Sequence, residues 1–176
     1  LTEGGAGDMS APDVKQKLSR LGTRVSTTSA RDAIYGSMQT LSKRFAPSAE
    51  LLRLVLVSPR FDAKSIELLR VQRLNDLALA ANDPSRLSLN RWYAEAFAGH
   101  AYARPVDGTP ESVGRITGDD LKSAHANLLA RDALHVVIVG DIDKRAASDA
   151  LDAIFGSLPE KAKVVPIERV EPRRLA

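Results

Sequence analysis

Residues 61–84 constrain the fold most strongly, because they predict one long helix with a defined start and end. They read FDAKSIELLRVQRLNDLALAANDP, and the apolar side chains recur every three or four positions, as one face of an α-helix requires. Asp62 can cap the start of this helix. Asp83 and Pro84 end it and begin another helix, because Pro is favoured at the first helical position behind an Asp cap. A layer of long amphipathic helices is therefore expected.

Other helix ends are also marked in the sequence. Ser10 is a typical N-cap, and Gly22 supplies a stop after the apolar repeat that follows it. Thr109 and Pro110 repeat the pattern of a cap followed by Pro at the first helical position. These signals predict several helices joined by short loops.

Two short segments rich in β-branched and aromatic residues predict a β-hairpin. They are residues 24–28 and 33–41, on either side of the polar turn SARD at residues 29–32. A third run, LHVVIV at residues 134–139, is apolar throughout and predicts a strand covered on both faces. Residues 164–170 suit either a strand or a linker. The expected fold class is α+β, with a mainly antiparallel sheet and helices packed on one of its faces.

Three strands make a small sheet for so many helices, so we expect further strands from before residue 1 or from a partner. The sequence begins at Leu1 without an initiator Met or a signal-peptide pattern, which favours a piece of a longer protein or a processed form. We expect residues 1–160 to form a single domain that lacks its N-terminal strands. Residues 161–176 would link it to a following domain.

Composition excludes several classes of function. The chain has no cysteine, which rules out a disulfide scaffold, a thiolate metal site and a cysteine nucleophile, and is compatible with both cytoplasm and periplasm. The net charge of +3 is spread along the chain and only 5% of residues are aromatic, so nucleic acid is not the expected partner. The apolar runs are far shorter than the roughly 18 residues of a membrane span.

The three histidines, His100, His125 and His135, are not spaced to bind one metal ion. None lies three or four residues from another, and neither HExxH nor HxxEH occurs. His125 is expected on a helix surface and His135 inside the apolar strand. A nucleotide-binding α/β domain built on residues 134–143 is a further alternative, although no glycine fingerprint follows that strand.

Several short motifs occur in an order that is more specific than any one of them. A GGAG turn is followed by the SARD hairpin, PRFD, the long helix ending in NDP, HAYARPVDGTPES and VVIVGDID, over residues 1 to about 158. This order resembles the pitrilysin and insulinase-type zinc peptidases, which include the mitochondrial processing peptidases. The resemblance implies a metallohydrolase-like domain of the processing-peptidase type, here partial and without its N-terminal strands and metal-binding helix.

Catalytic members of that family hold zinc with the two histidines of HxxEH, use its Glu as general base and take a third ligand from a Glu on a later helix. By resemblance, Asp76 stands at the position of the third ligand and Leu69 at that of a supporting Glu. Asp is one methylene shorter than Glu, so its carboxylate would fall about 1 Å short of a zinc ion. Loss of a supporting acceptor typically lowers affinity or activity by about ten- to a hundredfold. The resemblance thus implies no catalytic residue and no metal ligand in this chain, with zinc the cofactor of catalytic members only.

Two interpretations of the resemblance stay open. In the first, the chain is a non-catalytic half that binds peptide or unfolded polypeptide and pairs with a homologous catalytic half, as a second domain or subunit. Asp76 is then a solvated carboxylate. In the second, HxxEH lies just before residue 1 of an active zinc metalloendopeptidase, and Asp76 serves as a poor ligand.

The first interpretation points to specific residues. Ser26 and Thr27 match a residue pair on the strand at the cleft edge of the family, where an extended peptide can add as a further strand. Tyr102, Arg104 and Gly108 are expected to be structural residues of a loop. Pro105 and Gly108 would fix its turn, and Arg104 would bond backbone carbonyls.

Overall fold

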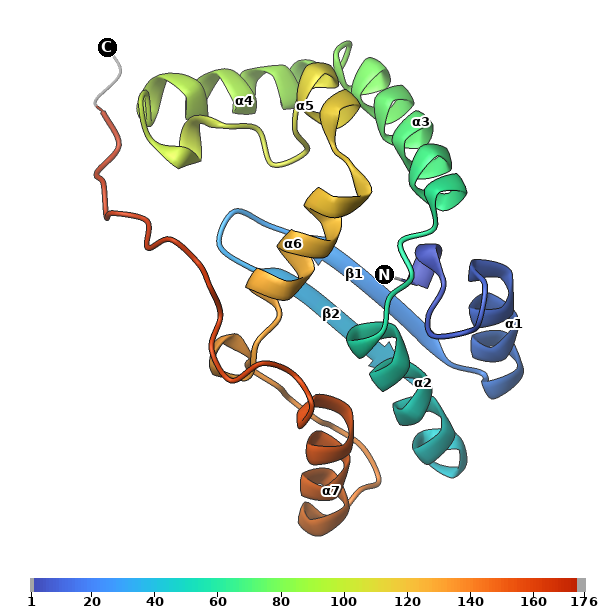
Figure 1. Ribbon diagram of the computed structural model, residues 1–176. Coiled ribbons are helices and arrows are strands. Elements are labelled where there is room, and N and C mark those ends of the chain that lie inside the picture. Colours follow the sequence, from blue (N-terminus) through green and yellow to red (C-terminus); the bar gives the residue numbers. More distant parts are fainter. Residues whose placement is uncertain (1, 174–176) are drawn as a thin grey trace. The chain divides into compact units, whose positions relative to one another are not determined.

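The structure is a computed structural model that describes residues 2–173. Over this range it contains seven α-helices, four short 3-10 helices and one two-stranded antiparallel sheet (Figure 1). The chain forms two compact units. The first comprises residues up to Thr28, Tyr35–Ile66 and Gly118–Val164, and the second comprises Ser29–Ile34, Glu67–Thr117 and the residues from Val165 onward.

The first unit is built around a small core between its two N-terminal helices. Ala6, Val14 and Val55 are buried together, and α2 also packs against α7. A capping box of Ser10 and Asp13 begins α1, and Gly22 ends it in a left-handed conformation, as the sequence predicts. The elements of this unit are η1 (Thr2–Gly4), α1 (Ala11–Leu21), most of the strands β1 (Arg24–Ser29) and β2 (Ile34–Gln39), η2 (Ser42–Arg44), α2 (Phe45–Val57), α6 (Gly118–Leu128), η4 (Arg131–Ala133) and α7 (Lys144–Phe155).

Strands β1 and β2 form the hairpin that the sequence predicts. The Ala30 amide donates to the Ala33 carbonyl at 2.8 Å, and the hydroxyls of Ser26 and Ser37 lie 2.9 Å apart. Both pairs fit one register, in which Thr27 lies opposite Gly36. Since hydrogen-bonded and non-hydrogen-bonded pairs alternate along an antiparallel ladder, the backbone groups of Ser26 point toward β2, and those of Thr27 point away from it.

Three hydroxyl groups join the hairpin to α2. Thr23 precedes β1, Thr40 follows β2 and Ser48 lies in α2 with only 1% of its surface exposed. The Thr23 and Ser48 hydroxyls are 2.7 Å apart, and Thr40 lies 2.8 Å from Thr23 and 2.9 Å from Ser48. The Ser48 hydroxyl also donates to the Arg44 carbonyl at 2.7 Å. Each buried hydroxyl therefore has a partner, as burial of a polar group requires.

Residues 134–139 do not form the predicted strand. They have no regular secondary structure, and Val137 and Val139 are 86% and 93% exposed. The apolar pattern correctly describes a segment suited to burial. A strand, however, also needs backbone partners, and the sheet within residues 2–173 consists of β1 and β2 alone. Residues 164–170 are likewise without regular structure.

The second unit contains the long helix and the loop motif singled out in the sequence. Arg70 on α3 donates to the carbonyls of Val113, Gly114 and Ile116, at 2.6, 3.2 and 2.7 Å, and so satisfies the end of a short helix. The predicted cap at Asp83 is confirmed, because its side chain accepts from two amides at the start of the next helix. The elements are α3 (Ala63–Ala80), which starts in the first unit, α4 (Pro84–Ala96), η3 (Ala101–Ala103) and α5 (Pro110–Arg115), which begins at the predicted Thr109 cap. Within residues 2–173, no helix is both long enough and apolar enough to cross a membrane.

Candidate functional site

Asp76 and Leu69 both lie on α3 and are both exposed to solvent, Leu69 by 39%. Within residues 2–173, no three or more His, Asp and Glu side chains come together in a way that could hold a metal ion. A catalytic zinc ion needs three protein ligands converging on one point. Asp76 is therefore not part of a complete three-ligand zinc site within residues 2–173.

The two strand residues matched to the peptide-binding pair lie in the middle of β1, and both are exposed. Ser26 bonds across the ladder to Ser37, so its side chain is engaged within the hairpin. Thr27 presents its backbone amide and carbonyl to the side of β1 that faces away from β2. Within residues 2–173 no strand pairs with this side of β1, so Thr27 supplies backbone groups with which an added strand can bond.

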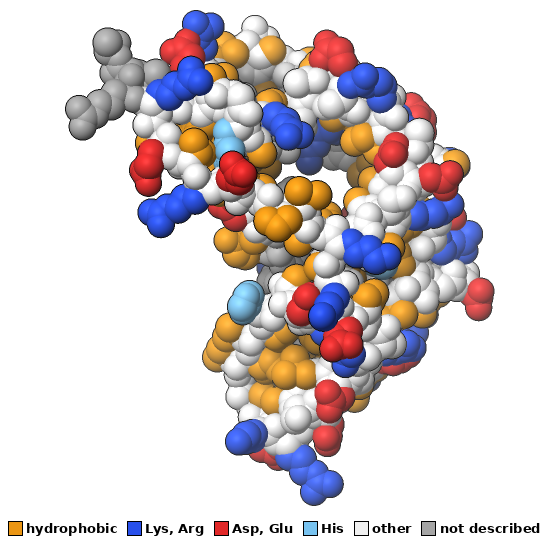
Figure 2. Space-filling model, turned by 60° about the vertical axis from the view of Figure 1, so that its left-hand side comes forward, with side chains coloured by type: hydrophobic (Ala, Val, Ile, Leu, Met, Phe, Trp, Pro, Cys, Tyr) orange, Lys and Arg blue, Asp and Glu red, His pale blue; other side chains and the backbone are white. Residues whose placement is uncertain are grey.

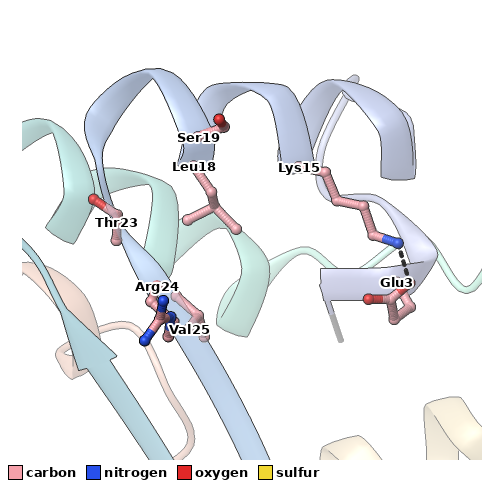
Figure 3. A pocket seen from close by; sticks show the side chains of 7 residues that line it. All are labelled: Glu3, Lys15, Leu18, Ser19, Thr23, Arg24 and Val25. Carbon is pink, nitrogen blue, oxygen red and sulfur yellow. Dashed lines mark ion pairs between the residues drawn. The ribbon is translucent and has the colours of Figure 1, made fainter.

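A shallow hollow opens beside the start of β1 (Figure 3). Its volume is about 300 Å³, and Leu18 from α1 and Val25 from β1 contribute apolar side chains to it. Lys15 and Glu3 form an ion pair of 2.6 Å at its border. The hollow is large enough for one side chain and combines an apolar floor with a charged rim.

The HAYARP loop is held by a residue that the sequence did not single out. The Arg31 guanidinium donates from Nη1 to the carbonyls of Tyr102 and Arg104, both at 2.8 Å. It also lies over the Tyr93 ring, with its central carbon 3.6 Å from the ring centroid. The guanidinium that bonds backbone carbonyls is thus that of Arg31 and not, as expected, that of Arg104, whose side chain is exposed.

Tyr102 is held by Asp32, which lies in the same hairpin turn as Arg31. Its hydroxyl donates to Asp32 Oδ1 at 2.6 Å, and this bond raises the pKa of Tyr102 above the usual tyrosine value. Further along the loop, the Gly108 amide donates to the Pro105 carbonyl at 3.1 Å, and Gly108 has a φ of +78°. Tyr102 and Gly108 therefore lie in a loop ordered by hydrogen bonds.

The histidines lie apart from one another in three different settings. His125 is half-buried rather than on the helix surface, with Nε2 2.7 Å from the Leu56 carbonyl and its ring edge-on to Phe61. His135 is exposed rather than in a core, because the strand expected around it is not formed. His100 Nε2 lies 3.0 Å from the Glu168 carbonyl. Each histidine therefore has a surrounding unlike that of a shared metal site.

The surface charge is mixed. Figure 2 shows Lys and Arg side chains interspersed with Asp and Glu over the visible face, with hydrophobic side chains between them. Several opposite charges are paired, as where Asp107 lies 3.1 Å from both Arg73 and Arg86. A face of this kind does not have the clustered positive charge that binding of a nucleic acid backbone requires.

Comparison with known proteins shows which proteins this chain is similar to in sequence and in fold. The model of the peptidase M16 inactive domain matches residues 115–175. The chain is 25% identical over 147 residues to an uncharacterized zinc protease of Mycobacterium leprae, covering 84% of this chain and 33% of that protein. A crystal structure of a peptidase M16 inactive domain from Pseudomonas fluorescens superposes with a TM-score of 0.91 at 24% identity, covering 98% of this chain and 43% of the other. These similarities support a relationship of the chain to the M16 peptidases.

The match to an inactive domain supports a relationship of the chain to the non-catalytic half of these peptidases. The chain is also 30% identical over 109 residues to a non-peptidase homolog of Helicobacter pylori, covering 62% of this chain and 25% of that protein. The chain spans about a third of the length of the mycobacterial zinc protease that it matches. The motif order from GGAG to VVIVGDID therefore indicated the same family as these comparisons do.

Proposed function

We propose that this M16 domain binds extended polypeptide along the free edge of β1 and pairs with a homologous catalytic half. The observation that carries this proposal is the register of the hairpin, which leaves the amide and carbonyl of Thr27 facing away from β2. Main-chain hydrogen bonds to such an edge bind many sequences, which suits a domain that presents substrates to a protease. Residues 161–176 would carry the chain toward a following domain.

Two further features support the proposal. The hollow beside Arg24 and Val25 could take one side chain of a bound peptide, with Leu18 giving apolar contact. By resemblance, Asp76 and Leu69 hold the α3 positions of the family's third zinc ligand and supporting Glu, and neither belongs to a three-ligand metal group within residues 2–173. Together these features support polypeptide binding rather than hydrolysis as the role of this domain.

A proline at the free edge tests the proposal. Thr27→Pro removes the outward amide of β1 without removing a hydrogen bond to β2, a placement that edge strands tolerate. Gly36→Pro is a matched control, because Gly36 lies opposite Thr27 on β2 and its outward amide faces the other edge of the hairpin. A Cβ at Gly36 would meet no other atom within 4 Å, so this position has room for a side chain.

Binding of a fluorescently labelled, unstructured peptide to the full-length protein is measured by fluorescence anisotropy. Loss of one backbone hydrogen bond, together with the clash of the proline ring, should weaken binding by about tenfold in Thr27→Pro, which corresponds to about 1.4 kcal/mol. Gly36→Pro should bind as the unmodified protein does. Equal affinities for both variants, or an absence of peptide binding by the unmodified protein, would contradict the proposal.

A further inference from the structure

Two sequence motifs that lie about 70 residues apart meet at the tip of the hairpin. SARD forms the turn between β1 and β2, and HAYARP forms η3 and the loop after it. The turn and the loop belong to the same compact unit. We call their junction the tip clamp, which consists of Arg31, Asp32, Tyr93, Tyr102 and the Arg104 carbonyl.

The turn itself is poorly suited to hold a hairpin closed. Arg31 and Asp32 form a two-residue loop between Ala30 and Ala33, which are joined by the 2.8 Å bond from the Ala30 amide. Tight hairpin loops favour turns with positive φ values, whose twist matches that of the strands. Among the described residues, Phe61 is the only one other than glycine with a positive φ, so Arg31 and Asp32 lack that geometry. The tip therefore depends on contacts from outside the hairpin.

The tip clamp supplies such contacts with both residues of the turn. Arg31 gives two charge-assisted hydrogen bonds and one cation–π contact, and the planar guanidinium can make them at the same time. Asp32 accepts the Tyr102 hydroxyl at 2.6 Å. The Tyr102 ring is in turn packed edge-on against Phe97 and His100, at centroid distances of 5.5 and 4.8 Å. The surfaces that hold the turn are thus themselves ordered.

We propose that Arg31 is a positioning residue for polypeptide binding, which acts by holding the hairpin tip in the tip clamp so that the edge of β1 is ordered before a peptide arrives. This inference rests on the proposed function of β1. A strand that is already extended loses less conformational freedom when a peptide pairs with it, and so binds more tightly. Arg31 itself does not contact the peptide in this scheme.

The test compares Arg31→Ala with Arg91→Ala in the full-length protein. Arg91 is a matched control, because it is an exposed arginine on α4 that pairs with Glu95 and lies outside the tip clamp. Hydrogen exchange at the Ala30 amide reports the closure of the tip, and anisotropy with a labelled, unstructured peptide reports affinity. Arg31→Ala should accelerate that exchange and weaken peptide binding, each by about tenfold, as expected when a cation–π contact and charge-assisted hydrogen bonds are lost. Arg91→Ala should change neither.

A spectroscopic measurement separates the tip clamp from a general loss of structure. Opening of the clamp breaks the Tyr102–Asp32 bond, so the pKa of Tyr102, followed by phenolate absorbance, should fall back toward the usual tyrosine value. If Arg31→Ala does not fold, Arg31→Lys serves in its place, because it keeps the charge but cannot form the planar double contact.

The outcomes distinguish this inference from the proposed function. If the unmodified protein binds no peptide, the proposed function and the positioning role both fail. If it binds peptide and the Arg31 variant binds equally well, only the positioning role of Arg31 is wrong. Unchanged exchange at Ala30 in the Arg31 variant would likewise overturn the inference.

Discussion

Gly108 offers a quantitative test of the loop geometry. Its φ of +78° is unfavourable for any residue with a Cβ, and a Cβ built there would lie 2.9 Å from Ser112 Oγ and 3.3 Å from Val113 Cγ2. Ser112 Oγ accepts from the Thr109 amide at 2.8 Å, in the capping box that begins α5. An alanine at position 108 would therefore introduce strain into the backbone and displace a helix cap.

The size of the effect follows from these two terms. Forcing alanine into the left-handed region costs about 1–2 kcal/mol. Disturbing the cap adds about 1 kcal/mol, so Gly108→Ala should destabilise by about 2–3 kcal/mol in total. Two other glycines of the same unit separate the contribution of backbone strain from that of the disturbed cap. Gly99 has a φ of +87° but open space around a Cβ, whereas Gly114 is helical and also has open space.

The assay is urea denaturation of the three alanine variants beside the unmodified protein, with the unfolding free energy compared between them. Gly99→Ala should cost about 1–2 kcal/mol from strain alone. Gly114→Ala should stabilise by about 0.5–1 kcal/mol, because glycine is unfavourable inside a helix. If Gly108→Ala destabilises no more than Gly99→Ala, the clash with the Ser112 cap is refuted, and a destabilising Gly114→Ala would refute the description of α5.

Two further predictions concern ionisable side chains. The bond to Asp32 raises the pKa of Tyr102, so its stabilisation is fully present below the unfolded tyrosine pKa of about 10 and is lost as the pH rises through the raised value. Urea midpoints of the unmodified protein, measured across this alkaline range, should fall as that stabilisation is lost. The midpoints of Tyr102→Phe should not show this fall, because the variant has no hydroxyl to ionise. The same pH dependence of the midpoint in both proteins would contradict the assignment. Asp76→Ala should leave the zinc content of the full-length protein unchanged and the stability within about 0.5 kcal/mol, because the side chain is exposed. A fall in zinc stoichiometry, measured by atomic absorption, would instead identify Asp76 as a ligand.

Local signals in the sequence predicted local structure well. The caps at Ser10, Asp83 and Thr109 are each formed by a residue and its immediate neighbours, so no distant partner is needed to decide them. The predicted turn between the two β-rich segments is also present, since the β-forming residues and the polar turn residues lie within one short stretch of sequence. The family followed from the order of motifs, which no single motif establishes.

Features that depend on distant partners were not predictable in the same way. The run at residues 134–139 has the composition of a strand, but composition reports suitability for burial and not the presence of a hydrogen-bonding neighbour. The contacts of Arg31 with Tyr93 and Tyr102 span 62 and 71 positions, and an arginine in a turn is usually a solvated residue. A signal was nonetheless present, because a two-residue turn without glycine or asparagine is unusual in a hairpin.

The run at residues 134–139 has a consequence for a fragment that consists of this part of the chain alone. It combines β-branched residues, no acidic or basic side chain other than one histidine, and no proline, which are the properties of segments that assemble into cross-β fibrils. Val137 and Val139 are almost fully exposed when residues 2–173 stand alone, so a fragment of this extent presents the segment to another copy without prior unfolding. A fragment released with this surface uncovered would therefore tend to aggregate and become a substrate for quality-control chaperones.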